Sequence, residues 1–202
     1  MIIYKDIITG SEFASDAYPI KIVDDVFYEV DCQLITVKDG VDIDIGANPS
    51  TEEAEEQFEE GSRKVNNVVH AFNLVETTFD AVDYIKHLKP YMKRLEKLLK
   101  KKNPDMNVKE WKDKLNIVVK NRIFVELSDE ENKNKNKMKK ASEIKFQFFV
   151  GSTQFVEVEE EKPDGTKQWV EVEGMVALLD YREDGMTPYF ILFKDGLIEE
   201  KV

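Results

Sequence analysis

The chain of 202 residues contains little of what most catalytic and metal sites are built from. It has one cysteine, Cys32, and two histidines, His70 and His87. A single cysteine excludes an intramolecular disulfide, which fits a reducing compartment. Structural zinc needs clustered cysteine or histidine ligands, so the sequence predicts no zinc site. A Cys–His catalytic pair would have to join residues that lie far apart in the sequence.

Sequence motifs of enzymes are also missing. The sequence has no glycine-rich phosphate loop, no nucleophile elbow and no His-Glu-x-x-His helix. It has 41 acidic residues, so chance pairs of carboxylates are certain to occur and indicate no acid–base chemistry. We therefore expect a protein that is not an enzyme and that needs no cofactor.

Long hydrophobic runs are absent as well. No segment approaches the roughly 20 consecutive apolar residues that span a bilayer. Lys5 and Asp6 interrupt the apolar N-terminus before it could form a secretory signal. The net charge of −12 argues against general affinity for nucleic acid or anionic membranes. The sequence therefore predicts a cytoplasmic protein that binds neither.

The many carboxylates leave two interpretations of calcium binding. Asp42, Asp44 and Gly46 form a fragment of the EF-hand spacing, but no third ligand and no terminal glutamate follow in the required places. Either the acidic surface associates weakly with calcium, or it is a solvated face that holds no metal. The sequence names no ligand set.

What is present predicts an α+β fold in one domain over residues 1–202. Short apolar runs separated by tight turns indicate strands over residues 1–37. The segment 46–64 is crowded with glutamates and has Phe58 as its large apolar residue, so we expect a mobile acidic loop there. Strand character returns over residues 65–79.

Apolar residues then recur every three or four positions, which predicts an antiparallel α-helical hairpin over residues 79–127. The first helix is expected from about residue 79 to 102, with Pro90 either kinking it or splitting off its first turn. The second is expected from about residue 107 to 127, with Asn107 and Glu110 capping its start.

Two insertions and a closing hairpin complete the chain. Residues 128–143 are charged and polar and read as a long loop. Residues 152–173 alternate apolar and acidic residues around an Asp-Gly turn, which predicts a β-hairpin. Two apolar runs separated by a charged turn predict a second hairpin over residues 174–202.

The first predicted helix concentrates positive charge in an acidic protein. Between residues 86 and 102 eight cations stand against one acid, Glu96: they are Lys86, Lys89, Lys93, Arg94, Lys97, Lys100, Lys101 and Lys102. Such a charge asymmetry steers an acidic partner toward the helix. The alternative interpretation is an ordinary solvated helix face.

Three segments of the chain match known sequence motifs: Met1-Ile-Ile-Tyr-Lys-Asp-Ile7, Ile45-Gly-Ala-Asn-Pro-Ser-Thr-Glu52 and the closing hairpin. In this order they resemble the translationally controlled tumour protein (TCTP) family, also called histamine-releasing factor. The resemblance implies a β-tent, related to the Rab-binding exchange-factor fold, with mostly antiparallel strands and a projecting helical hairpin. The sequence departs from the family at Ser152, where glutamate is usual, and at Val202, where the family ends in cysteine.

The resemblance also implies a function. It implies a multi-partner interaction protein, without catalysis, that supports growth, cytoskeletal organisation and survival and binds calcium. The basic helix matches the region that the family associates with tubulin and microtubules. Glu12 matches an acidic residue implicated in contact with a Ras-type small GTPase (Rheb), so a guanine nucleotide exchange factor is the alternative. Family members also occur outside cells without a signal peptide, which keeps a secreted, cytokine-like role open.

Overall fold

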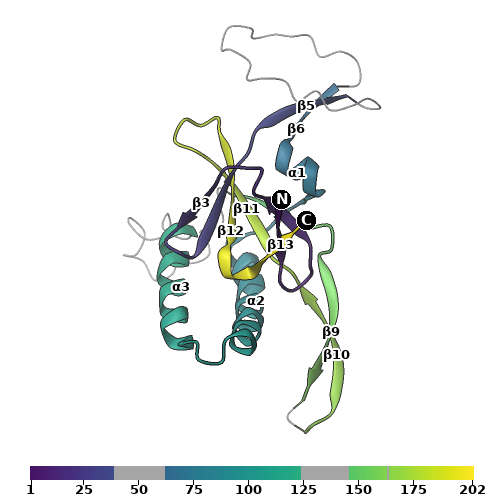
Figure 1. The fold of residues 1–202 in the computed structure, drawn as a ribbon, viewed down its shortest axis with the longest axis vertical. Coiled ribbons are helices and arrows are strands. Elements are labelled where there is room, and N and C mark those ends of the chain that lie inside the picture. Colours follow the sequence, from purple (N-terminus) through teal and green to yellow (C-terminus); the bar gives the residue numbers. More distant parts are fainter. Residues whose placement is uncertain (39–61, 124–145, 163) are drawn as a thin grey trace.

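The computed structural model describes residues 1–38, 62–123, 146–162 and 164–202. Within these ranges the chain forms four antiparallel sheets and a pair of long helices (Figure 1). This is the α+β arrangement that the sequence predicts. The expected loop at 128–143 lies outside the described residues, and so does most of the expected acidic loop at 46–64.

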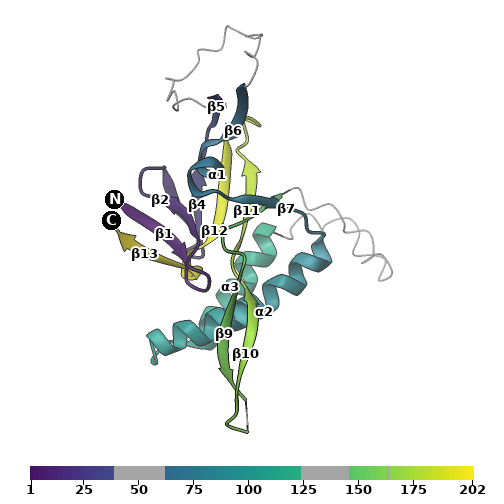
Figure 2. The same cartoon turned by 90° about the vertical axis from the view of Figure 1, so that its right-hand side faces the viewer.

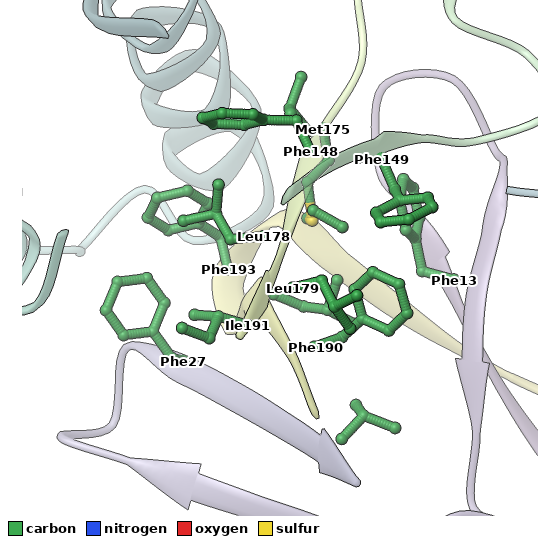
Figure 3. Close-up of a cluster of buried hydrophobic side chains, with 14 of the residues drawn as sticks. Phe13, Phe27, Phe148, Phe149, Met175, Leu178, Leu179, Phe190, Ile191 and Phe193 are labelled. Carbon is green, nitrogen blue, oxygen red and sulfur yellow. The ribbon is translucent and has the colours of Figure 1, made fainter. Parts of the chain in front are cut away.

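A six-stranded sheet with the order β3-β4-β12-β11-β8-β7 forms the centre of the molecule. Its strands are β3 Ile20–Val23, β4 Phe27–Asp31, β7 Val75–Thr77, β8 Gln147–Val150, β11 Val176–Tyr181 and β12 Pro188–Phe193. Every residue of β12 is buried, because both faces of this strand are covered. Figure 3 shows phenylalanine, leucine and isoleucine side chains of the sheet gathered in one cluster with Phe13 and Met175.

The two ends of the chain lie side by side in a three-stranded sheet with the order β13-β1-β2 (Figures 1 and 2). Its strands are β1 Ile2–Asp6, β2 Glu12–Ser15 and β13 Leu197–Lys201. The N–H of Val202 donates to the carbonyl of Met1 over 2.9 Å. The hairpin expected near the C-terminus is confirmed, since β11 pairs with β12 and a short 3₁₀ helix, Lys194–Gly196, leads into β13.

The predicted helical hairpin consists of α2 Ala81–Lys102 and α3 Val108–Ile123, which lie antiparallel to each other in both views (Figures 1 and 2). Pro90 lies inside α2, which is continuous, so it does not split off a first turn. Asn107 accepts from the N–H of Glu110 over 3.3 Å, which confirms the expected cap. The expected end of the second helix, 124–127, lies outside the described residues.

The strand expected over residues 65–79 is wrong in its middle. There the chain forms α1 Asn67–Phe72. The side chain of Asn66 caps this helix by accepting from the N–H groups of Val68 and Val69, and Asn73 ends it in the left-handed conformation at φ 50°. A strand β6 Ser62–Asn66 precedes it and pairs with β5 Leu34–Lys38. The last three residues assigned to the acidic loop are therefore strand.

The β-hairpin expected over residues 152–173 is present as β9 Phe155–Glu161 and β10 Lys167–Glu173. Gly165 takes φ 82° in its turn, and Asp164 accepts from the N–H and the hydroxyl of Thr166. Figure 2 shows this hairpin running away from the six-stranded sheet and past the helices.

Candidate interaction surfaces

The basic residues of α2 lie opposite its buried stripe. Tyr84, Leu88, Tyr91 and Leu95 are buried in the core, as their spacing predicts. Five lysines at three- and four-residue spacing occupy the other side and are exposed: Lys86, Lys89, Lys93, Lys97 and Lys100. Lys101 and Lys102 extend this exposed basic face to the end of the helix.

Neighbouring carboxylates neutralise part of this basic face. Glu160 of β9 lies 3.1 Å from Arg94 and 3.7 Å from Lys97, and Asp83 lies 2.7 Å from Lys86. The side chain of Arg94 is largely covered, so this arginine does not belong to the exposed basic face. No ion pair with any described residue involves the remaining cations: Lys89, Lys93, Lys100, Lys101 and Lys102. The uncompensated charge therefore lies in the middle of the helix and at its C-terminal end.

Two polar contacts of buried side chains add to the apolar packing of α2. The carboxylate of Asp6 is fully buried and accepts from the N–H and hydroxyl of Thr9, the N–H of Met175 and the hydroxyl of Tyr91. Burial raises the pKa of Asp6, and the bonds from Thr9 and Met175 oppose that shift. His87 contacts Glu173 of β10 through Nδ1 at 2.7 Å. The contacts of Tyr91 with Asp6 and of His87 with Glu173 tie the helix to β1 and β10.

Helix α3 buries Leu115, Val119 and Ile123 and is also attached through charged and hydrogen-bonding side chains. Trp111 donates from Nε1 to Asp195 over 2.7 Å. Lys114 contacts Asp25 at 2.7 Å. Arg122 contacts Glu29, which lies in β4, at 2.5 Å. All three partners lie in the strands and turns of the body, far away in the sequence.

Glu29 is the centre of a network that sequence reasoning missed. Its side chain is 3% exposed and also accepts from Arg182, whose guanidinium lies 3.8 Å from the ring centroid of Tyr189. Arg182 contacts Asp31 as well. Glu29 shares a face of β4 with Phe27 and Asp31, but no spacing rule pairs it with arginines that lie 93 and 153 residues away in the sequence.

Glu12 lies on the edge strand β2, and its side chain is nearly half exposed. It contacts Lys5 at 3.2 Å, and Lys5 also contacts Glu200 at 2.8 Å. The hydrogen bonds to Glu200 and Glu12 raise the pKa of Lys5. The carboxylate expected to meet a GTPase is therefore accessible but is shared with a lysine of the adjacent strand.

Two cavities lie between α2 and the β9–β10 hairpin, and Arg94 lines both of them; together we call them the groove. One cavity of about 350 Å³ is lined by Ile7, Ile8, Arg94, Lys97, Leu98, Val158, Glu159, Glu160 and Glu161. A second of about 350 Å³ is lined by His87, Pro90, Tyr91, Arg94, Phe155, Val170, Glu171, Val172 and Glu173. The ion pair of Arg94 with Glu160 joins α2 to β9 across this groove.

The described residues contain no arrangement typical of a metal or nucleophilic site. Within the described ranges, no three His, Cys, Asp or Glu side chains are grouped so as to hold a metal ion. Asp42, Asp44 and Gly46 lie outside those ranges. Cys32 is buried, and burial raises the pKa of its thiol to about 12, so the reactive thiolate is scarce at neutral pH. Among the described helices, none has the length and apolar character to cross a membrane.

Known proteins resemble this chain along its whole length. The sequence model of the translationally controlled tumour protein family matches residues 1–149 and 130–198. The translationally controlled tumour protein homologue of Schizosaccharomyces pombe is 42% identical over 201 residues, which cover all of this chain and 99% of the relative. The homologue of Saccharomyces cerevisiae is 39% identical over 202 residues, with both chains fully covered.

Solved structures agree with the sequence matches. The tumour-associated protein p23fyp of Schizosaccharomyces pombe superposes with a TM-score of 0.65 at 41% identity, with both chains fully covered. The protein from Caenorhabditis elegans superposes with a TM-score of 0.59 at 29% identity, covering all of this chain and 99% of its own. The sequence matches and the structural matches identify the same family, and the chain belongs to the translationally controlled tumour protein family.

Proposed function

We propose that this protein is a non-catalytic, cytoplasmic interaction protein whose α2 basic face binds an acidic protein surface, with tubulin in microtubules as the partner. One observation supports the proposal above the others. The uncompensated lysines Lys89, Lys93 and Lys100 share one exposed face of a helix whose opposite face is buried in the core. The cations are therefore presented on a fixed support, which limits the ordering entropy lost on binding.

Electrostatics favours a partner that approaches closely. The whole chain carries a charge of −12, but at physiological salt the Debye length is about 8 Å. Distant carboxylates are therefore screened, while lysines on the contact surface are not. Acidic tubulin surfaces would meet these lysines first, and association would weaken as salt is added.

The test is co-sedimentation with stabilised microtubules. The variant Lys89→Glu, Lys93→Glu, Lys100→Glu should bind at least about tenfold more weakly than the unchanged protein. A matched variant carries the same charge change at exposed lysines elsewhere: Lys21→Glu, Lys162→Glu and Lys201→Glu. It should bind nearly as well as the unchanged protein. Equal losses in both variants would show that net charge, and not the α2 face, controls association.

Guanine nucleotide exchange on a Ras-type GTPase is the second candidate, supported by the accessible carboxylate of Glu12 on an edge strand. In this role Glu12 would compete for the lysine or magnesium contacts of the nucleotide phosphates. Substoichiometric protein should then accelerate release of a fluorescent nucleotide, and Glu12→Gln should abolish the acceleration. Glu200→Gln, which changes the other partner of Lys5, is the matched control. Release that stays at the spontaneous rate contradicts exchange and leaves the microtubule proposal intact.

A further inference from the structure

The β9–β10 hairpin has an open edge. Neither strand pairs with any other described strand. Lys162 donates its N–H to the carbonyl of Thr166, and Gly174 donates its N–H to the carbonyl of Gln154. Antiparallel hydrogen bonding alternates along the strand, so the even-numbered residues of β9 bond to β10. The backbone groups of Glu157, Glu159 and Glu161 therefore point away from β10.

The side chains of the same three glutamates form a row on one face of β9, because alternate residues of a strand share a face. All three are exposed. Glu159 contacts Lys167, while Glu157 lies directly opposite Glu171, a pairing of like charges that destabilises the hairpin. Alternate residues are about 6.6 Å apart, which is also the spacing of alternate side chains on an added strand.

An exposed tryptophan stands beside this row. Trp169 is 68% exposed and lies directly opposite Glu159 in the register of the hairpin. Tryptophan is enriched at protein interfaces, and the face of its ring attracts the cation of lysine or arginine. The row and the ring together favour a partner with basic side chains.

The opposite side of the same edge borders the groove. The cavity there, of about 350 Å³, is lined by the apolar residues Ile7, Ile8, Leu98 and Val158 and by charged residues that include Glu159 and Glu161 of the row. Its two cations, Arg94 and Lys97, are paired with Glu160. A strand laid along β9 would thus have one face toward the glutamate row and Trp169 and the other toward the apolar residues Ile7, Ile8 and Leu98 of the groove.

We propose that the β9 edge binds an extended segment of another protein in which lysine or arginine alternates with apolar residues. The segment adds to the hairpin as a third strand. Its backbone bonds the free N–H and C=O groups of β9, its cations pair with the glutamate row and Trp169, and its apolar side chains enter the groove. This surface is distinct from the exposed lysines of α2.

The probe is a capped octapeptide of alternating lysine and valine, titrated into the ¹⁵N-labelled full chain. Saturable amide shifts are expected at Glu157, Glu159 and Glu161, where the new backbone bonds form. Two comparison peptides have the same composition. One has four lysines followed by four valines, and the other is N-methylated at alternate amides. Both should bind at least about tenfold more weakly, since one lacks the alternation and the other lacks the donors.

A pair of variants separates local from general charge effects. Glu159→Lys should weaken binding of the alternating peptide about tenfold, because an attraction becomes a repulsion in the centre of the row. Glu183→Lys makes the same charge change at an exposed position in the β11–β12 turn and should leave affinity within about twofold. Equal weakening by both variants, equal affinity for the N-methylated peptide, or no binding of the alternating peptide would overturn the proposal. A chain that sediments as a dimer through this edge would also overturn it, with a second copy as occupant.

Discussion

The two helices of the hairpin are attached to the same body by different chemistry. Helix α2 is held mainly by apolar burial, with Tyr84, Tyr91 and Leu95 nearly inaccessible to solvent. Helix α3 also buries Leu115, Val119 and Ile123. In addition, Trp111, Lys114 and Arg122 attach it to the body through hydrogen bonds and ion pairs. Apolar burial is neither screened by salt nor coupled to a titrating group, whereas exposed ion pairs are screened by salt and depend on pH. The difference leaves Lys89, Lys93 and Lys100 of α2 available to a partner, while Lys112, Lys114 and Arg122 of α3 are paired within the molecule.

The largest expected effect breaks the apolar attachment of α2. Leu95 is fully buried, so Leu95→Ala should lower the free energy of unfolding by about 2–5 kcal/mol through lost transfer energy and the cavity left behind. Urea denaturation measures this loss. Val82→Ala, at an exposed position of the same helix, should change it by no more than about 0.5 kcal/mol. A loss below about 1 kcal/mol for Leu95→Ala would contradict attachment by burial.

The next effect breaks the charged attachment of α3. Glu29→Gln removes the carboxylate shared by Arg122 and Arg182, and should lower the free energy of unfolding by about 1–3 kcal/mol. The loss stays moderate because both arginines are partly exposed and regain water. Glu199→Gln, at an exposed site of β13, is the control. Equal stabilities for the two variants would show that the network does not hold the helix.

A smaller effect concerns the start of α3 alone. Trp111→Phe keeps an aromatic ring, although a smaller one, and removes the hydrogen bond from Nε1 to Asp195, whose loss should cost about 1 kcal/mol. Hydrogen exchange should become faster at the first amides of α3 and stay unchanged at the buried middle of α2. Uniform acceleration in both helices would mean that they open as one unit, which removes the contrast between them.

The smallest effect is the pH dependence of a surface contact. Hydrogen bonds from Lys114 and Lys194 lower the pKa of Asp25 to about 2, below its ordinary value of 3.8. The unfolded chain therefore takes up this proton first as pH falls, so the contribution is present above about pH 4 and disappears toward pH 2. Asp25 is 62% exposed, which limits the contribution to about 1 kcal/mol or less.

Unfolding of Asp25→Asn measured between pH 7 and pH 2 tests this sign. The variant should be less stable than the unchanged protein at pH 7 and equal to it near pH 2. Asp24→Asn is the matched control, since Asp24 shares the left-handed turn conformation. A difference that persists unchanged at pH 2 would contradict the role of the Asp25 carboxylate.

The sequence predicts what depends on local periodicity. The stripe from Tyr84 to Leu95 and the turn at Asp164 follow from spacings within a few residues, and both are present. Helix α1 was missed because Val68 and Val69 favour a strand, although Asn66 and Asn73 carried the signals of its start and end. A helix this short is recognised by its capping residues and not by its apolar composition.

Contacts between distant segments could not be predicted. The pairing of Arg94 and Lys97 with Glu160 depends on how the β9–β10 hairpin lies against α2, which no spacing encodes. The same holds for Glu29 with its two arginines. These contacts decide which cations are available, so the basic helix was predictable from the sequence whereas its uncompensated residues were not.

The most direct measurement compares two double charge reversals on α2 in microtubule co-sedimentation at one fixed ionic strength. Lys89→Glu with Lys93→Glu changes cations without a described ion-pair partner, and Arg94→Glu with Lys97→Glu changes two that contact Glu160. Both pairs change the net charge equally. We predict that the first pair weakens binding at least about tenfold and the second pair clearly less. Equal weakening, or a larger loss from the second pair in a correctly folded protein, would contradict recognition through the uncompensated lysines.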